Sequence, residues 1–243
     1  MKLKLKTLGL ALAATTLSTL SFADESSPHS FSANVGAVSS YVVRGLTDTK
    51  DNENVALQGG IDYEHASGFY AGYWTSTLGD AYPDATLESD FYAGYNGSFT
   101  EDFGYTVGGT YYYYNDTDDL DGFETLLGLN YKDFSISAQT LVADLAWGNA
   151  GDTYLLASYS YPLPKDFTLN TSIGAYYYSD SGDFEGNTLD TTETFGFRHA
   201  TVGVSKPIAD TGASFNLDYI FGGYDRSDNK HGNTLVFGFN FAF

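Results

Sequence analysis

Apolar and polar residues alternate along most of this chain, and the pattern is clearest at its end. The last ten residues, TLVFGFNFAF, place Phe237, Phe239, Phe241 and Phe243 two apart, with smaller or polar residues between them. Successive side chains of a β-strand point to opposite faces, so a period of two predicts a strand with one apolar face. An open apolar face promotes aggregation in water. It therefore needs a second protein layer or lipid to cover it.

The same alternation predicts an all-β protein of twelve strands. In the second strand, for example, Leu57 and Ile61 alternate with Gln58 and Asp62. The tenth strand alternates less cleanly, and a β-bulge at residues 198–201 would explain it. The expected strands cover residues 31–44, 54–64, 68–78, 86–99, 103–114, 123–131, 134–143, 153–161, 167–179, 193–206, 213–224 and 233–243.

The links between these strands alternate in length. Long polar segments such as LTDTKDNEN and DSGDFEGNTLDTT follow the odd-numbered strands, whereas short links such as HAS and KD follow the even-numbered ones. Long loops at one end, short turns at the other and strands of about 10 residues are typical of a transmembrane antiparallel up-and-down β-barrel of the bacterial outer membrane. Closure satisfies every backbone donor and acceptor without water. An even strand number places both termini on the periplasmic side.

The first residues predict export. MKLKLKTLGLALAATTLSTLSFA has three lysines among its first six residues, followed by an apolar run. It ends on the small-x-small site Ser21–Phe22–Ala23, as a signal peptide does. The apolar run is shorter than the roughly 20 residues that a membrane helix needs. We expect residues 1–23 to be removed and residues 24–243 to form a barrel in the cell outer membrane.

Composition and charge support this picture and narrow the function. The chain has no Cys, so disulfides do not stabilise it, and 17% of its residues are aromatic. We expect the tyrosine clusters 111–114 and 176–178 to form girdles where the barrel meets the lipid head groups. The net charge is −20, and removal of the three leader lysines makes it −23. Such a charge disfavours nucleic acid, and a water-filled passage lined by it would favour cations.

The chain shows two resemblances to known groups of proteins. Exported barrel proteins resemble this chain in ending on Phe after alternating apolar residues, which implies that Phe237, Phe239, Phe241 and Phe243 form a signal read by the barrel assembly machinery. The stretches SSYVVRGLTDT (39–49) and VALQGGIDYEHASGFYAGYWTS (55–76) resemble the N-terminal signature of the TorF-type porins, a proteobacterial outer-membrane family formerly of unknown function. That family usually has an acidic residue where Ser40 stands. The resemblance implies an outer-membrane barrel with channel activity and no established substrate.

The interior decides the function. Barrels of about eight strands are filled by side chains and those of sixteen to eighteen form channels, so twelve strands allow a narrow pore. Arg44 is expected on the polar face of the first strand, either in an ion-pair network or as a selectivity residue. The inward, pore-lining candidates are Arg44, Gln58, Asp62, Glu64, Glu88, Asp90, Glu124, Arg198 and Asp218.

Carboxylates outnumber basic groups in this set, and rings of carboxylates favour cations. We therefore predict a weakly cation-preferring outer-membrane channel for passive diffusion of small polar solutes or ions. We expect a monomer in contact with outer-membrane lipids and lipopolysaccharide, with no catalytic, cofactor or metal site.

Two other classes stay open. A barrel enzyme acting on lipid would need a serine and histidine pair, for which His199 is the one histidine on a strand. A structural or adhesive barrel would bind a partner through its acidic loops. The loop NDTDDLDG (115–122) superficially resembles a calcium loop, but Thr117 and Gly128 occupy the positions of its first and last carboxylates. Loose bridging of divalent ions to lipopolysaccharide remains an alternative.

Overall fold

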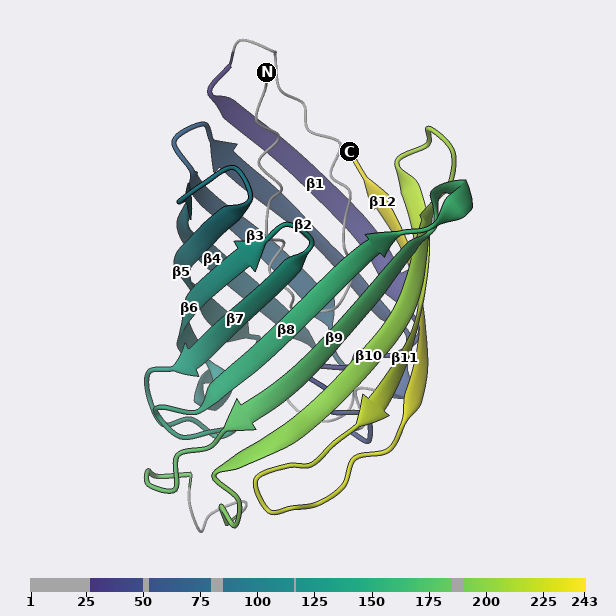
Figure 1. The fold of residues 1–243 in the computed structure, drawn as a ribbon. Helices are drawn as coiled ribbons and strands as arrows, with labels where there is room; N and C mark the ends of the chain where they lie inside the picture. Colours follow the sequence, from purple (N-terminus) through teal and green to yellow (C-terminus); the bar gives the residue numbers. More distant parts are fainter. Residues whose placement is uncertain (1–26, 50–52, 80–84, 116, 185–189) are drawn as a thin grey trace.

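The protein is a closed antiparallel β-barrel (Figure 1). The computed structural model describes residues 27–49, 53–79, 85–115, 117–184 and 190–243; the expected signal peptide lies outside them. Each strand pairs with its neighbours in the chain, and β12 pairs with β1 to close the ring. The strands are β1 (His29–Val38), β2 (Ala56–His65), β3 (Phe69–Thr77), β4 (Leu87–Ser98), β5 (Phe103–Tyr114), β6 (Gly122–Tyr131), β7 (Phe134–Leu141), β8 (Thr153–Pro162), β9 (Thr168–Tyr177), β10 (Phe195–Pro207), β11 (Ala213–Gly222) and β12 (Thr234–Ala242).

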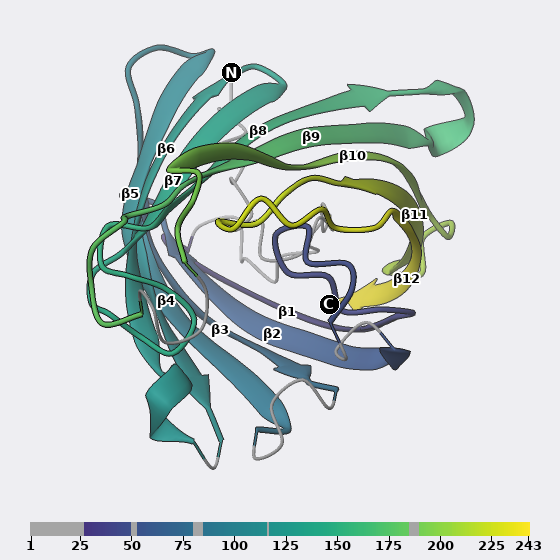
Figure 2. The same cartoon turned by 90° about the horizontal axis from the view of Figure 1, so that it is seen from below.

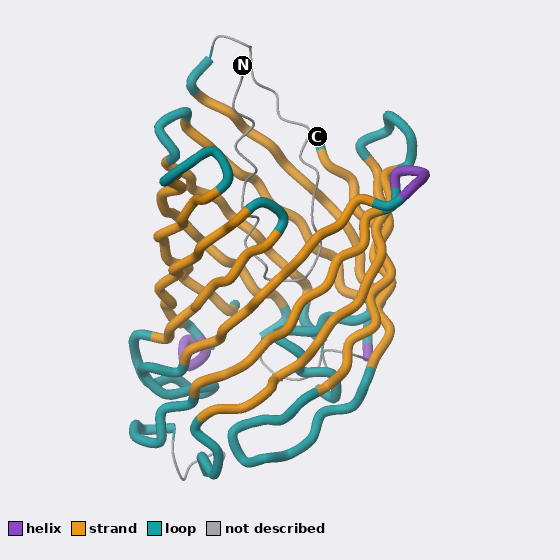
Figure 3. Tube along the Cα trace, in the orientation of Figure 1, coloured by secondary structure: helices purple, strands orange, loops and turns teal. Residues whose placement is uncertain are grey.

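Two short helical turns between strands are fully contained in the described residues (Figure 3). These are η2 (Asp118–Leu120) and η3 (Pro164–Asp166). None of the helices in the described ranges is long and apolar enough to cross a membrane.

The wall is apolar outside and polar inside. Ile61, Leu127 and Phe237 expose 57%, 59% and 51% of their surface, although all three lie in the middle parts of strands. Their neighbours on the opposite face are buried polar residues such as Glu124 and Asp218. This is the reverse of a soluble protein, where large apolar side chains fill the interior. Lipid on the outside is the environment that fits such a wall.

The strand that closes the barrel carries the terminal phenylalanines. It is paired to β1 from Asn34 opposite Ala242 to Val38 opposite Gly238. The backbone of Phe243 adds two hydrogen bonds to Ala33, of 2.8 and 2.9 Å. Phe237, Phe239, Phe241 and Phe243 all point outward, with exposures between 38% and 51%.

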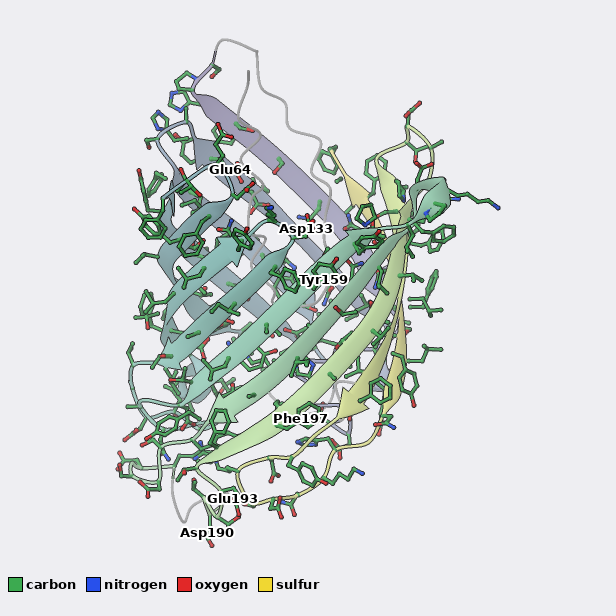
Figure 4. All side chains as sticks on the ribbon, in the orientation of Figure 1. Glu64, Asp133, Tyr159, Asp190, Glu193 and Phe197 are labelled. Atoms are coloured by element: carbon green, nitrogen blue, oxygen red, sulfur yellow. The ribbon has the colours of Figure 1, made fainter. Side chains whose placement is uncertain are left out.

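The two ends of the barrel differ as the link lengths predict. The short turns and the N-terminal end of β1 lie at the end marked N and C in Figure 1, and the long loops lie at the other end. Glu64 and Asp133 mark the first end in Figure 4, and Asp190 and Glu193 mark the second. We call these the turn end and the loop end.

The prediction of twelve antiparallel strands is confirmed, and so is the bulge in the tenth. The pairing of β10 with β9 shifts register between Phe197 and His199. The prediction for the first strand is wrong in one respect: β1 ends at Val38, and residues 39–44 leave the wall. Arg44 therefore lies in a loop with a positive φ of 47° rather than on a strand face.

Candidate functional site: a constriction inside the barrel

The segment that follows β1 folds into the barrel instead of away from it (Figure 2). We call residues 39–49 the inner loop. Its start is fixed to β12, because the backbone N–H of Ser39 donates to Phe237 O at 2.8 Å and the Ser39 hydroxyl accepts from Phe237 N–H at 3.0 Å. Its end is fixed to the loop between β11 and β12, where Thr47 donates to Gly232 O at 2.7 Å.

Apolar side chains explain why the inner loop turns inward. Tyr41 is 2% exposed and packs with Val38, Ala56, Ile220 and Val236 in the one apolar cluster found inside the described part of the barrel. Val42, Val43, Trp74 and Leu78 cover this cluster. Burying these groups stabilises the inward conformation by about 25 cal/mol for each Å² of apolar surface removed from water.

Gly45 makes the close approach to the far wall possible. Its φ is +76°, a conformation that L side chains rarely adopt, and a Cβ there would lie 2.5 Å from the Cβ of His199 on β10. Only glycine satisfies both conditions without strain.

Arg44 connects the inner loop to β6. Its guanidinium donates to both carboxylate oxygens of Glu124, at 2.8 and 2.5 Å, and to the Tyr176 hydroxyl at 2.7 Å. The Tyr112 hydroxyl accepts a longer bond of 3.2 Å, and the guanidinium carbon lies 4.9 Å from the ring centre of Tyr154. In the closed strand order β6 lies nearly opposite β1, where the inner loop begins. The inner loop, with the Arg44–Glu124 pair at its tip, therefore forms a bar across the interior.

The Arg44–Glu124 pair is a buried, charge-assisted contact. The side chains of Arg44 and Glu124 are 10% and 2% exposed. Burial disfavours the charged guanidinium, but Glu124 and the neighbouring tyrosines outweigh it and raise the pKa of Arg44 above its ordinary value. Arg44 is thus a permanent positive charge whose field is largely cancelled by one carboxylate.

The bulge in β10 supplies a second support for the inner loop. It turns two successive residues inward, so that Arg198 and His199 are both buried. Arg198 Nε donates to Arg44 O at 3.0 Å, and its NH1 group contacts His231 Nε2 at 2.8 Å. His231 Nδ1 lies 2.6 Å from an Asp48 carboxylate oxygen, which links this support back to the inner loop.

The wall beside this pair, on β4, is acidic. Glu88 and Asp90 are successive inward residues of β4, exposed by 3% and 0%. Tyr41 of the inner loop donates to Glu88 at 2.7 Å. Burial raises the pKa of the Tyr41 hydroxyl, and the charges of Glu88 and Asp90 raise it further, so this tyrosine remains a donor. The constriction therefore presents the acidic side chains of β4 close to the neutralised pair of Arg44 and Glu124.

The other candidates lie along the inner wall away from the constriction or at its edge. Gln58 contacts the Ser76 hydroxyl at 3.3 Å near the loop end. Asp62 accepts a hydrogen bond from Tyr92, and Asp218 accepts one from Asn216. Glu64 lies near the turn end (Figure 4). The structure therefore brings Arg44, Glu88, Asp90, Glu124 and Arg198 together and leaves Gln58, Asp62, Glu64 and Asp218 apart from that group.

The expected tyrosine girdles are only half correct. Tyr111, Tyr113 and Tyr177 point outward, with exposures of 42%, 42% and 48%. Tyr112 is 4% exposed and, like Tyr176, bonds to Arg44 inside the barrel. The reason is the strand period of two, which sends adjacent tyrosines of one cluster to opposite faces.

The inward tyrosines, together with Tyr41, Tyr154 and His231, are the residues of the constriction that sequence reasoning missed. Tyr112 shares a face with Thr110, so the alternation pattern contains the signal for that one. The inward path of residues 39–49 has no such signal.

His199 does not have the environment of a catalytic base. Its Nε2 lies 2.7 Å from the Tyr154 hydroxyl and its Nδ1 lies 3.3 Å from the Thr201 hydroxyl, so neither nitrogen contacts a serine in the described part of the chain. The described ranges also contain no group of three or more His, Asp or Glu side chains that could hold a metal ion. What the constriction can do is restrict passage by size and charge.

The fold is that of known porins. The structure of the KdgM porin superimposes with a TM-score of 0.56 at 12% identity, covering 87% of this chain and 99% of that one. A KdgM porin in complex with disordered oligogalacturonate gives a TM-score of 0.55 at the same identity. The NanC porin gives 0.53 at 10% identity, covering 88% of this chain and 98% of the other.

At the level of sequence, a family model described as a bacterial protein of unknown function (Gcw_chp) matches residues 22–238. A search of curated proteins gave no match.

Proposed function

Because this chain belongs to the bacterial family Gcw_chp, whose function is unknown, and folds as a porin-like barrel, we propose that it is an outer-membrane channel of the TorF type. It would let small polar solutes or ions diffuse passively, with a weak preference for cations. The observation that carries this proposal is the bar of the inner loop and the Arg44–Glu124 pair across a polar interior that is closed by a complete ring of strands. Twelve strands leave an interior wide enough for a narrow passage beside this bar.

The charges inside support the cation preference. Arg44 is paired with Glu124, and Arg198 donates to the Arg44 carbonyl and to His231. Glu88 and Asp90 add two acidic side chains on β4, two strands along the wall from Glu124. Carboxylates lining a constriction raise the local concentration of cations and repel anions. The preference is weak because the basic groups lie within the same layer.

The proposal also covers the membrane location, the insertion and the oligomeric state of the protein. An apolar outer wall fits the outer membrane, with both termini in the periplasm and the acidic loops facing lipopolysaccharide. The exported chain would be inserted by the barrel assembly machinery, to which the outward Phe237, Phe239, Phe241 and Phe243 offer a signal. We propose a monomer, because the interior of one barrel contains the whole constriction.

The test is conductance of the refolded mature chain in a planar lipid bilayer. We expect discrete conductance steps in potassium chloride and a reversal potential of the sign for cations under a salt gradient. Clear anion selectivity would refute the cation preference. An absence of steps from a sample that shows the heat-modifiable gel migration of a folded barrel would refute the channel itself.

A further inference from the structure

The inner wall formed by β3, β4 and β5 carries polar atoms with nothing to bond. Within the described ranges, the buried side-chain oxygens without a hydrogen-bond partner are both carboxylate oxygens of Asp90, the Thr110 hydroxyl and the Tyr70 hydroxyl. Leaving a buried polar group unpaired costs about 1–3 kcal/mol, and a charged group costs more. Four such atoms on one wall indicate a surface shaped to bond something other than the protein.

The strand register places these atoms in a row. Asp90 on β4 lies directly opposite Trp74 on β3 and Tyr112 on β5. Thr110 is the next inward residue of β5, diagonal to Asp90, and is 1% exposed. The Tyr70 hydroxyl continues the row towards the turn end, since a Cβ on Gly108 of β5 would lie 2.5 Å from it. Opposite side chains in a sheet have Cβ atoms about 4.5–5.5 Å apart, so Asp90 lies between two aromatic rings.

Among the acidic side chains of the constriction, Asp90 is the one whose carboxylate accepts no hydrogen bond from the protein. Glu88 accepts from Tyr41, and Glu124 accepts from Arg44 and from Tyr112. Asp90 exposes none of its surface and has no donor. An ionised carboxylate buried in this position costs several kcal/mol relative to water unless a cation lies close by, and without one it takes up a proton. Arg44 is already held by Glu124.

The donor count and the rings identify the kind of cation. A primary ammonium group has three N–H donors, and Asp90 with Thr110 offers three acceptor oxygens. The aromatic side chains of Trp74 and Tyr112, which flank Asp90 in the register, favour a cation that is only weakly hydrated, as an organic ammonium is. A calcium ion takes six to eight oxygen ligands, and the described ranges contain no cluster of acids able to bind a metal ion.

We propose that Asp90 and Thr110, between Trp74 and Tyr112, form a binding site for the primary ammonium group of a solute. The proposal rests on the channel function and deepens it, because it names the chemical class of solute that the channel selects. The Tyr70 hydroxyl, farther along the row, offers a hydrogen bond to the uncharged part of that solute.

Binding can be measured without conductance, so the two proposals fail separately. The chain has two tryptophans, Trp74 and Trp147. In a Trp147→Phe background the emission of Trp74 reports on the site in the detergent-refolded protein. The probe is methylammonium chloride, titrated against potassium chloride at the same ionic strength. We expect a saturable change of Trp74 emission with methylammonium and none with potassium.

Two variants and a control make the assignment specific. Asp90→Asn keeps the shape and should raise the half-saturating concentration at least tenfold, and Thr110→Val should raise it about threefold, since each removes acceptors. Asp218→Asn removes a buried carboxylate elsewhere on the inner wall and should change the half-saturating concentration of methylammonium less than twofold. The proposal would be overturned if Asp90→Asn bound methylammonium as tightly as the wild type. It would also be overturned if Trp74 emission changed linearly with methylammonium, or saturated in the same way with potassium. Heat-modifiable migration confirms that each variant is folded.

Discussion

Glu124 is the residue at which the constriction is most easily loosened without harming the wall. The change Glu124→Gln keeps the size of the side chain and an acceptor for the guanidinium but removes the charge that compensates Arg44. Breaking a buried ion pair costs about 3–5 kcal/mol when the partner stays buried and uncompensated. Arg44 keeps its bonds to Tyr176 and Tyr112, of 2.7 and 3.2 Å, and its contact with the Tyr154 ring. We therefore take the lower end of the range.

A loss of about 3 kcal/mol lowers the ratio of docked to undocked inner loop about a hundredfold, because 1.4 kcal/mol corresponds to a factor of ten. The barrel wall is not affected, because the β1–β12 and β5–β6 backbone pairing does not involve Glu124's carboxylate. In single-channel recordings we expect Glu124→Gln to show frequent transitions to a level of larger conductance, with a reduced cation preference. The inner loop should also become a site of proteolytic cleavage.

Arg44→Met and Glu64→Gln complete the experiment. Arg44→Met undocks the same loop but leaves Glu124 unneutralised, so it should give the same larger conductance with an increased cation preference. Glu64→Gln makes the same chemical change near the turn end and should leave the conductance levels unchanged. If Glu124→Gln keeps the wild-type level and the inner loop stays protected from protease, the bar does not restrict the lumen and the reasoning is wrong.

Three further predictions concern other parts of the molecule. Gly45→Ala should displace the inner loop, because its Cβ would lie 2.5 Å from the Cβ of His199, and should give the larger conductance level with unchanged charge. Leu127→Arg places a charge on the outer wall and should lower the stability in lipid by about 2–4 kcal/mol, measured by urea titration of refolding into vesicles, whereas a soluble protein would lose little. Asp144 accepts hydrogen bonds from two backbone N–H groups, which lower its pKa, so its contribution to loop order is present above the unfolded-state pKa and disappears as the pH falls through the lower folded value. Protease cleavage of the loops should accordingly increase in acid, and Asp144→Asn should abolish that pH dependence.

The architecture could be predicted from sequence because lipid and water impose opposite demands on alternate residues of every strand. Ile61 and Asp62 are adjacent in sequence, and the structure exposes 57% of the first on the outside and turns the second to a hydrogen bond with Tyr92 inside. Because alternate residues of a strand face opposite sides, this difference appears in the sequence as an alternation of apolar and polar residues. The irregular spacing around Arg198 predicted a bulge for the same reason.

The constriction could be predicted only in part, because it depends on contacts between distant segments. Val42 and Val43 have the composition of a strand, so their path into the lumen is a tertiary effect that overrides local preference. Arg44 and Glu124 are 80 positions apart in the chain, and no periodicity connects them. The inward Asp90 was predictable, but the absence of any donor for it becomes visible only when the neighbouring strands are in place.

The inner loop also determines the order in which the protein can mature. The residues that hydrogen-bond to the inner loop lie on β4, β5, β6, β9 and β10. The loop can therefore reach its final position only after most of the ring has formed. During insertion the future passage must therefore be wider than in the finished molecule. Contacts of such large sequence separation form late, because closing a long stretch of chain costs entropy before the contact repays it. On the proposed function, we expect the passage to narrow late in biogenesis, after the strands that hold the inner loop have been inserted.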